Sequence, residues 1–393
     1  MKELIEKALS HVEPSSDEKE KLLGLKDKIL KKIDILELTE VEPKVVGSIA
    51  KGTFLSGTDI DIFLIFKKGT NLKKEGLEIA RKILPDGKEL YAQHPYLRGE
   101  IDGVGIDLVP CFAIDNSSES ISAVDRTPFH TDWVVSNIGD LENEIRLTKQ
   151  FLKAVGAYGA NSAIGGVSGY LVEILCIKYK GFLNLIKKIS QWKPPVIIDK
   201  MKTPDSPIML CDPVDKNRNV AAGVTLKGLG TAILASKSFI NNPSMNFFFP
   251  EFKERKFQGN ITSIILELPE GTEESTLPWL QKQGRKIYKA LHDFEPIAWN
   301  ANIGDKGYIV IETGITKLPE IVSHKGPAPW EEGAIEFLKR YPDAALNNER
   351  LEIGKKPKKR TLNEVVKNLL PGAEIVEGLC PGSKPILRVP WLN

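Results

Sequence analysis

The sequence has few of the features of a secreted or membrane-bound protein. Only four cysteines occur among 393 residues, far apart and without a C-x-x-C pair, which argues against a disulfide framework and a structural zinc site. No apolar run approaches the ~20 residues that span a bilayer, and the amino-terminal MKELIEKALSHVEPSSDEKEK lacks the apolar core of a signal peptide. We therefore expect a protein of the reducing cytoplasm with no membrane partner.

A strong charge balance is also absent. Charged residues make up 27% of the chain, but the formal net charge is only +2. Contact with an acidic polymer must therefore depend on charge placed locally. With 393 residues, 41% of them hydrophobic, the chain is long enough for two or three domains.

The first predicted domain, residues 1–135, is a small mixed α/β unit. Ser15 and Glu18 have the spacing of a capping box at the start of an amphipathic helix. Asp102-Gly103 is a dipeptide typical of the tight turn between two antiparallel strands. The remaining elements that the pattern predicts here are strands near 44–46 and 59–66, helices over 17–36 and 71–84, and strands on both sides of the Asp-Gly turn.

The rest of the chain divides near residue 255. Residues 136–255 predict helices over about 141–155, 167–189 and 225–240, with irregular proline-rich connections over 191–223. Residues 256–393 begin with the strand-helix-strand-strand order of a ferredoxin-like unit. The fold class expected is therefore α+β and multidomain, with a mixed-sheet first domain, a helical central domain and a ferredoxin-like α+β carboxyl-terminal region.

Two carboxylates interrupt the most hydrophobic predicted strand. Because side chains alternate along a strand, Asp59 and Asp61 share one face while Ile60 and Ile62 occupy the other. Asp107, in the run after the Asp-Gly turn, adds a third carboxylate from a strand that can lie beside the first. A D-x-D alone is usually a strand end that faces solvent. Three carboxylates at the edge of a core repel one another unless a cation neutralises them, so together they predict a metal site.

Oxygen ligands of this kind suit Mg²⁺, and two such ions about 3.5 to 4 Å apart hold the attacking and leaving oxygens of a phosphoryl transfer. Gly47-Ser48 follows a strand and precedes a predicted helix, so it presents backbone N–H groups and a hydroxyl to an anion. Lys51 lies one turn later and adds a cation. We therefore predict that Gly47, Ser48 and Lys51 contact a nucleotide, although a Gly-Ser pair alone is usually only a turn.

At these residues the chain resembles the nucleotidyltransferase superfamily of DNA polymerase beta, whose signature is a Gly-Ser turn, a D-x-D strand and a third carboxylate. The segments SAVDRTPFHTDWV, GVSGYLVEIL and DPVDKNRNVAA extend the resemblance to the archaeal-type (class I) CCA-adding enzymes, over essentially the whole chain. The resemblance implies a catalytic head over 1–135, a helical central domain over 136–255 that completes the nucleotide site, and a body and tail over 256–393 that bind tRNA.

The reaction implied is transfer of CMP from CTP, and then of AMP from ATP, to the 3′ end of tRNA without a template and with release of pyrophosphate. By the same resemblance the three aspartates would be catalytic ligands of two Mg²⁺ ions. His130, Lys149 and Tyr158 would complete the nucleotide site. Each has a structural alternative: a satisfied histidine, a solvated helix charge and a core aromatic. Because Lys149 and Tyr158 are nine residues apart, a helix must end or bend near Gly156 if both contact one ligand.

Two departures from the family pattern are visible. Lys51 stands where many relatives have arginine, so the charge is kept but a bidentate phosphate contact is not. Gly165 or Gly166 stands where some relatives have a basic residue, so any phosphate contact made there must come from elsewhere. The expected metal ligands are intact.

Base selection without a template requires protein groups that read the incoming base. Arg218 is our candidate, because a guanidinium only donates hydrogen bonds and suits the acceptors of cytosine and adenine. Uracil and guanine present an N–H at the corresponding ring position and would be disfavoured. The alternative is a loop arginine paired with Asp212 or Asp215.

A basic run, KKPKKR, lies near the carboxyl terminus and precedes Thr361 and Glu364, which have capping-box spacing. Such a run is usually a solvated surface, but here it predicts a contact with tRNA phosphates. The residues assigned to RNA binding are Lys355, Lys356, Lys358, Lys359 and Arg360.

Two other functions compete with CCA addition. A poly(A) polymerase or other terminal nucleotidyltransferase would use the same chemistry, and a catalytically silent RNA-binding protein would keep only the fold. Three intact carboxylates argue against the silent protein, because an unused acidic cluster destabilises the fold. The partners expected are tRNA, through its acceptor end and elbow, with CTP and ATP as substrates. The sequence leaves the oligomeric state open, a homodimer included.

Overall fold

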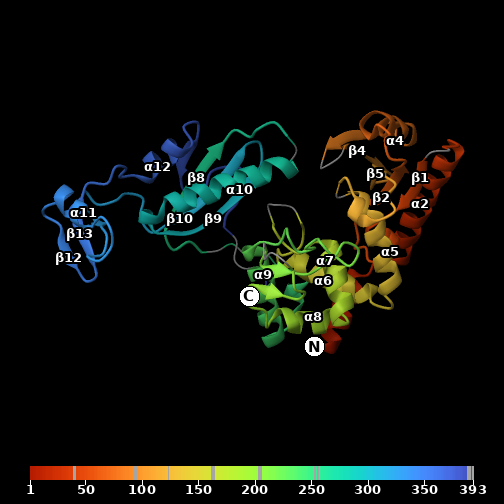
Figure 1. The fold of residues 1–393 in the computed structure, drawn as a ribbon, viewed down its shortest axis with the longest axis horizontal. Coiled ribbons are helices and arrows are strands. Elements are labelled where there is room, and N and C mark those ends of the chain that lie inside the picture. The colour runs from red at the N-terminus through yellow and green to blue at the C-terminus, as the bar shows by residue number, and fades with distance from the viewer. Residues whose placement is uncertain are drawn as a thin grey trace. The chain divides into compact units, whose positions relative to one another are not determined.

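The computed structural model describes residues 1–38, 41–91, 95–122, 124–160, 164–201, 206–251, 254, 256–271, 273–386 and 391. Within these residues the chain forms two compact units (Figure 1). Unit 1 comprises residues 1–251 together with Trp391, and unit 2 comprises the described part of 252–388. None of the described helices is long and apolar enough to cross a membrane.

A five-stranded mixed sheet in the order β1-β2-β5-β4-β3 forms the first part of unit 1. Its strands are β1 (Val41–Val45), β2 (Ile60–Phe66), β3 (Lys88–Tyr91), β4 (Pro95–Ile101) and β5 (Val104–Phe112). β2 and β5 are parallel, and the other neighbours are antiparallel. Asp102 and Gly103 both have positive φ, as the tight turn between β4 and β5 requires, which confirms the predicted hairpin.

Helices cover one face of this sheet, and we call the sheet with these helices the head. They are α2 (Ser16–Ile35) and α4 (Leu77–Ile83), which is preceded by a π-helical turn over Leu72–Gly76. Apolar residues of α2 and α4 pack in one core with Ile60, Ile62 and Ile106. Ser15 caps α2 by accepting the Glu18 N–H at 3.1 Å, which is half of the predicted capping box, whereas the Glu18 carboxylate accepts from the Ser56 hydroxyl and the Gly57 N–H instead. The opposite face of the sheet carries the aspartates.

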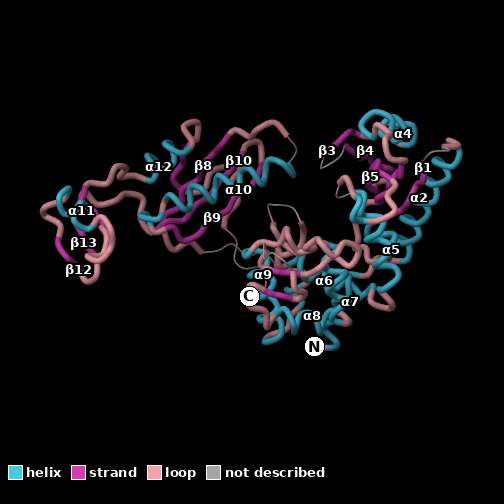
Figure 2. Tube along the Cα trace, in the orientation of Figure 1, coloured by secondary structure: helices cyan, strands magenta, loops and turns pink. Residues whose placement is uncertain are grey.

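A further set of helices in unit 1 forms a second part, which we call the neck (Figure 2). They are α1 (Lys2–Val12), α5 (Thr127–Asn137), α6 (Glu142–Ala154), α7 (Gly169–Tyr179), α8 (Phe182–Ile189) and α9 (Leu226–Asn241). Phe151, Phe182 and Phe239 pack edge to face in their core, with ring centroids 5.5 to 5.8 Å apart. α1 and α5 were not predicted.

Two sequence predictions for the neck are wrong. The single helix expected over 167–189 is two helices, because Lys180 and Gly181 adopt φ of 61° and 102°, which end α7 and start α8. The connections expected to be irregular over 191–223 contain a two-stranded sheet, β6 (Val196–Ile197) with β7 (Ile208–Met209). Residues 202–205 of that stretch lie outside the described residues.

Unit 2 confirms the ferredoxin-like prediction. Its main sheet has the order β14-β8-β10-β9 with every neighbouring pair antiparallel. In chain order the elements are β8 (Asn260–Leu266), α10 (Glu273–Ala290), β9 (Pro296–Ile303), β10 (Gly307–Thr313), α12 (Leu362–Leu369) and β14 (Glu374–Glu377). An insertion between β10 and α12, which the sequence did not predict, holds β11 (Val322–Lys325), α11 (Ala334–Arg340), β12 (Ala345–Asn347) and β13 (Arg350–Lys355).

Candidate active site

Three carboxylates lie on the face of the head sheet opposite α2 and α4. Asp61 of β2 and Asp107 of β5 are register partners on adjacent parallel strands, so their side chains leave the same face. Asp59 directly precedes β2, two residues before Asp61, and shares that face. The structure therefore brings the three predicted aspartates to one place.

The Gly-Ser turn meets these carboxylates directly. A Cβ added to Gly47, which has φ of +71°, would overlap the Asp61 carboxylate, so only glycine lets this carboxylate lie against the turn. The Ser48 hydroxyl lies 3.1 Å from that of Thr58. The helix expected after the turn is the single turn α3 (Gly47–Ala50), so it supplies little of the helix dipole that the sequence led us to expect.

Arg98 of β4 bridges two of the carboxylates and was missed in the sequence. Its guanidinium donates to Asp59 at 2.5 Å and to Asp107 at 3.0 Å, while its side chain is 40% exposed. The two-residue turn at Asp102-Gly103 fixes the hairpin register, in which Arg98 is the partner of Asp107. That register could have been counted from the turn, so the sequence carried the signal.

Asp61 has a strongly raised pKa. Burial, with the charges of Asp107 and Asp59, raises the pKa of Asp61 from 3.8 to about 7. Carboxylate oxygens and mutual repulsion suit a divalent cation. Among the residues that the structure describes, however, no three Asp, Glu, His or Cys side chains form a cluster that could hold an ion alone. The three aspartates could therefore bind a divalent cation only if Arg98 moves away from them or if a substrate supplies further oxygen ligands.

A pocket of about 260 Å³ is lined by three of the predicted nucleotide residues, Ser48, Lys149 and Tyr158, and by the predicted metal ligand Asp59. Lys149 and Tyr158 reach it together because α6 ends at Ala154 and Gly156 adopts φ of +77°, as the prediction required. Residues that the sequence analysis did not single out also line the pocket, among them Thr53, Thr58 and the exposed Lys153, one helical turn after Lys149.

Lys51 and Lys149 are both held by a buried carboxylate that the sequence analysis did not select. The Nζ atoms of Lys51 and Lys149 each lie 2.8 Å from Glu173 of α7. Lys149 is therefore no solvated helix charge, since its side chain is only 4% exposed. Lys51 does not line the pocket. The sequence feature that could have revealed Glu173 is a single glutamate in the otherwise apolar run LVEILCI.

His130 and Arg218 meet at a second buried carboxylate, Asp212. The His130 ring nitrogen lies 3.0 Å from Asp212, and Arg218 donates to it at 2.6 Å. Burial lowers the pKa of His130. Burial alone would raise the pKa of Asp212, but the contacts of this carboxylate with His130 and Arg218 lower the pKa to about 2. The pairing foreseen as the structural alternative for Arg218 thus exists, but 36% of the Arg218 side chain stays exposed.

Tyr170 connects this second cluster to the first. Its ring stacks on His130 with centroids 3.9 Å apart, and its hydroxyl donates to Asp212 at 3.1 Å. The Nζ of Lys51 lies 5.8 Å from the same ring. The residues predicted to hold phosphates and those predicted to read the base are therefore neighbours within unit 1.

The two glycines that replace an expected basic residue have a packing reason. A Cβ on Gly165 would overlap Thr225, and one on Gly166 would overlap the backbone carbonyl of Ala157. No basic side chain fits at either position in this fold, because the backbone segments approach too closely.

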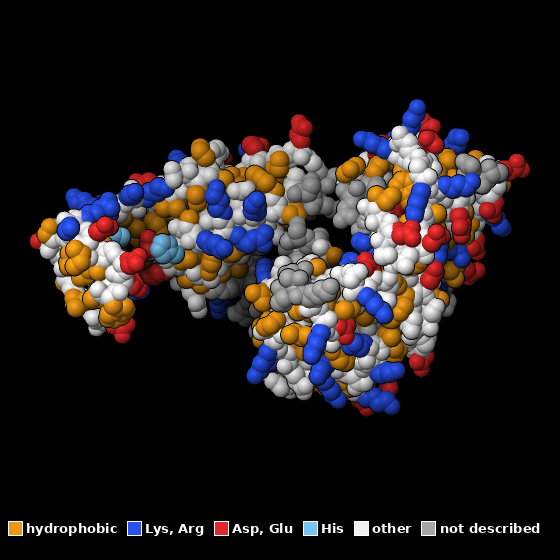
Figure 3. Space-filling model, viewed as in Figure 1, with side chains coloured by type: hydrophobic (Ala, Val, Ile, Leu, Met, Phe, Trp, Pro, Cys, Tyr) orange, Lys and Arg blue, Asp and Glu red, His pale blue; other side chains and the backbone are white. Residues whose placement is uncertain are grey.

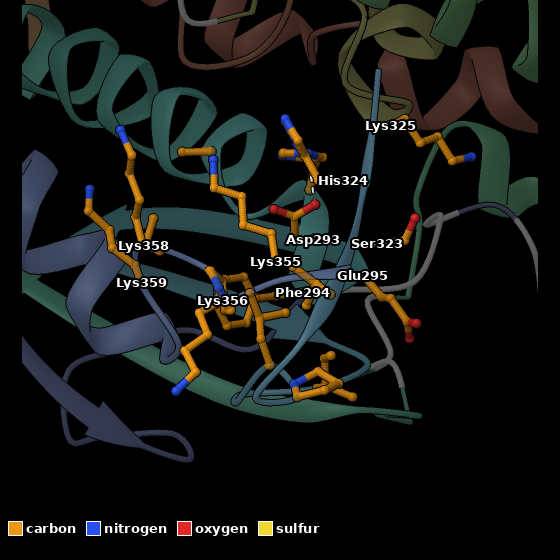
Figure 4. A pocket seen from close by; sticks show the side chains of 18 of the residues that line it. Asp293, Phe294, Glu295, Ser323, His324, Lys325, Lys355, Lys356, Lys358 and Lys359 are labelled. Atoms are coloured by element: carbon orange, nitrogen blue, oxygen red, sulfur yellow. Dashed lines mark ion pairs between the residues drawn. The ribbon is translucent and has the colours of Figure 1, made fainter. Parts of the chain in front are cut away.

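The basic run lies in unit 2, where Figure 3 shows Lys and Arg side chains gathered over the part between α11 and α12. Four of its lysines line a cavity of about 1040 Å³, and Figure 4 shows them leaving one segment. Asp293, Glu295, His324 and Lys325 line the same cavity. Arg360 is not among the lining residues. The lysines concerned are Lys355, Lys356, Lys358 and Lys359.

Two family models match the chain. One described as "Nucleotidyltransferase domain" matches residues 26–130, and one described as "tRNA nucleotidyltransferase, second domain" matches residues 143–249. The chain is 38% identical to the CCA-adding enzyme of Thermoplasma volcanium over 311 residues, 76% of this chain and 71% of that protein. It is 35% identical to that of Thermoplasma acidophilum over 350 residues, with coverages of 86% and 81%. A third, from Methanococcus maripaludis, is 35% identical over 373 residues, with coverages of 86% and 84%.

Proposed function

The chain belongs to the family of the archaeal CCA-adding enzymes, and on that premise we propose which of its residues perform the reaction. It is a tRNA nucleotidyltransferase that adds CCA to the 3′ end of tRNA from CTP and ATP, without a nucleic-acid template and with release of pyrophosphate. We place its action in the cytoplasm and propose a catalytic region over 1–135, a region over 136–255 that completes the nucleotide site, and a body and tail over 256–393 that bind tRNA. α1 and most of α5 fall within 1–135 although they pack with the neck.

Asp59, Asp61 and Asp107 are the proposed ligands of divalent cations, which this superfamily generally uses. Two Mg²⁺ ions bound there would activate the attacking 3′-hydroxyl and hold the nucleotide phosphates. The register of Asp61 with Asp107 supports this assignment, because it fixes both carboxylates on one face before any ligand arrives. Arg98 holds Asp59 and Asp107 in the same place by donating hydrogen bonds to both.

The 260 Å³ pocket is the proposed triphosphate site. Ser48 and Thr58 offer hydroxyls, and the turn at Gly47 offers backbone N–H groups. Lys153 is exposed at the pocket and can approach a phosphate without leaving a buried partner. Lys51 and Lys149 supply positive charge from fixed positions at its edge, and Tyr158 lies beside Lys149.

Arg218 is the proposed reader of the base. Asp212 holds one guanidinium nitrogen, and the exposed remainder can donate to the acceptors of cytosine or adenine. His130 packs against Tyr170 and contacts Asp212, so we assign it to the support of this arginine.

The lysine-lined cavity of unit 2 is the proposed contact with the tRNA elbow, while the acceptor end enters the active site. Phosphate contacts release counterions, so the affinity for tRNA should fall steeply with salt. The test replaces Lys355, Lys356, Lys358 and Lys359 with glutamine and measures tRNA affinity from 50 to 300 mM salt, roughly. A slope and affinity equal to those of the wild type would remove these lysines from the interface. Arg360 is replaced separately.

The observation that carries the proposed mechanism is the pairing of Asp61 with Asp107 on adjacent strands. The experiment compares Asp107→Asn with Asp86→Asn, an exposed carboxylate of the same head. Each protein receives tRNA without its 3′ end, Mg²⁺, and CTP and ATP separately or together. We expect three added nucleotides with the wild type and the control, and none with Asp107→Asn. Unlimited extension with ATP alone would instead identify a poly(A) polymerase.

A further inference from the structure

A buried carboxylate joins the head to the neck at the edge of the nucleotide pocket. Glu173 lies in α7 within an otherwise apolar run, and its side chain is 1% exposed. It accepts hydrogen bonds from the Nζ atoms of Lys51 and Lys149 at 2.8 Å each and from the Thr53 hydroxyl at 2.7 Å. Lys51 and Thr53 belong to the segment after α3, whereas Lys149 belongs to α6. Glu173 is therefore bonded to both parts of unit 1 at once.

Burial makes these charges depend on one another. Burial lowers the pKa of Lys149, an effect that Glu173 opposes. Although burial raises the pKa of Glu173, Lys149 and Lys51 hold it below its ordinary value. Two ammonium groups and one carboxylate carry one net positive charge. Without the carboxylate, two buried ammonium groups would lie side by side with no countercharge, which is strongly unfavourable.

The hydrogen bonds also fix where the lysines lie. An ammonium has three N–H donors. Those of Lys149 are taken by Glu173 at 2.8 Å and by the hydroxyl and carbonyl oxygens of Thr53 at 2.9 and 3.2 Å. Lys51 is 8% exposed and has Glu173 as its ionic partner. Neither ammonium is free to choose another position, so the positive charge beside the pocket is preorganised.

We propose that Glu173 is a positioning residue for the triphosphate of the incoming nucleotide, acting through Lys149 and Lys51. The inference rests on the proposed function, because it takes the 260 Å³ pocket as the triphosphate site. A fixed positive charge at that edge favours a triphosphate over the less negative monophosphate. It does not distinguish bases, so CTP and ATP depend on Glu173 equally.

The test compares Glu173→Gln, Glu173→Asp and a matched control, Glu144→Gln. Glu144 is another carboxylate of the neck that stabilises the structure, since it accepts the backbone N–H of Phe182 at 2.8 Å. Among the described residues, no lysine forms an ion pair with it. Affinities for CTP, ATP and CMP are measured by calorimetry with Mg²⁺ and without tRNA. Amide exchange of residues 47–54 reports whether the head segment is held in place.

We expect Glu173→Gln to bind CTP and ATP about 10- to 100-fold more weakly, the loss typical of a removed partner in a charged hydrogen bond. CMP affinity should change less than about threefold, because a monophosphate draws little on this charge. Glu173→Asp should restore part of the loss, and Glu144→Gln should keep the wild-type ratio of CTP to CMP affinity. Amide exchange of residues 47–54 should rise only in the Glu173 variants.

Three results would overturn the inference. Tighter CTP binding by Glu173→Gln would show that the carboxylate merely opposes the phosphates. Equal losses for CTP and CMP would show a general structural role. If Glu173→Gln does not fold, an unchanged CTP to CMP ratio in Glu173→Asp would decide against the inference. Failure of the proposed function itself would be visible in the wild type, as no addition of nucleotides from CTP and ATP to tRNA that lacks its 3′ end.

Discussion

Replacing Asp61 with asparagine should stabilise the protein at neutral and alkaline pH while it abolishes nucleotide addition. Burial, with the charges of Asp107 and Asp59, raises the pKa of Asp61 from 3.8 to about 7. The unfolded chain keeps the ordinary value, so the two states differ by about three pH units. At about 1.4 kcal/mol per unit, ionised Asp61 destabilises the fold by about 4 kcal/mol. Asparagine has nearly the same shape and no charge to desolvate.

The pH dependence follows from which state holds the proton. Below about pH 4, Asp61 is protonated in both states, and the wild type and the variant should have similar free energies of unfolding. As the pH rises from about 4 to about 7, the unfolded state releases the proton first, so the wild type progressively loses stability. Above about pH 7 both states are ionised, and the difference stays constant.

The assay is thermal and urea unfolding without divalent cations, from about pH 4.5 to 8.5, of the wild type, Asp61→Asn and the control Asp86→Asn. For a unit of this size each kcal/mol corresponds to about 2 to 4 °C in Tm. The excess of the free energy of unfolding of Asp61→Asn over that of the wild type should grow with pH. It should shrink when Mg²⁺ neutralises the wild-type carboxylates. An advantage that is independent of pH, or that is also given by Asp86→Asn, would refute the reasoning.

Three further variants test the neighbouring groups. Arg98→Gln should bind Mn²⁺ about tenfold more tightly in calorimetry without nucleotide, because the guanidinium that competes with the cation for two carboxylates is removed. An unchanged affinity for Mn²⁺ would show that the guanidinium and the cation do not compete. Lys153→Ala should weaken CTP and ATP binding equally, about two- to fivefold for an exposed charge, while Lys187→Ala on the surface of α8 should not; a loss for one nucleotide only would contradict a phosphate contact. Arg218→Ala should reduce discrimination against UTP and GTP about 10- to 100-fold in single-nucleotide addition, and Asp212→Asn by less; unchanged selectivity would exclude Arg218 as the base reader.

Local patterns in the sequence predicted most of the head. The alternation of Asp59 and Asp61 with buried isoleucines, and the Asp-Gly turn before Asp107, depend on rules of a few residues that tertiary packing did not override. The pairing of Arg98 with Asp107 could have been predicted by the same rules, because counting residues outward from the Asp-Gly turn places these two positions opposite each other. The break between α7 and α8 could not have been predicted in this way, because the hydrophobic periodicity continues across Lys180 and Gly181. Only the positive φ angles of these two residues show that one helix ends and another begins.

The sequence by itself determined that three carboxylates meet at one face of a sheet beside a Gly-Ser turn, because strand alternation and a two-residue hairpin are short-range geometry. Only the tertiary structure decided which charges neutralise one another. Glu173, Lys51 and Lys149 come from segments separated by up to 122 residues, and Asp212 reaches His130 across 82. The pKa values of Glu173, Lys149 and Asp212 depend on burial that only tertiary packing creates, and no local pattern in the chain encodes that burial.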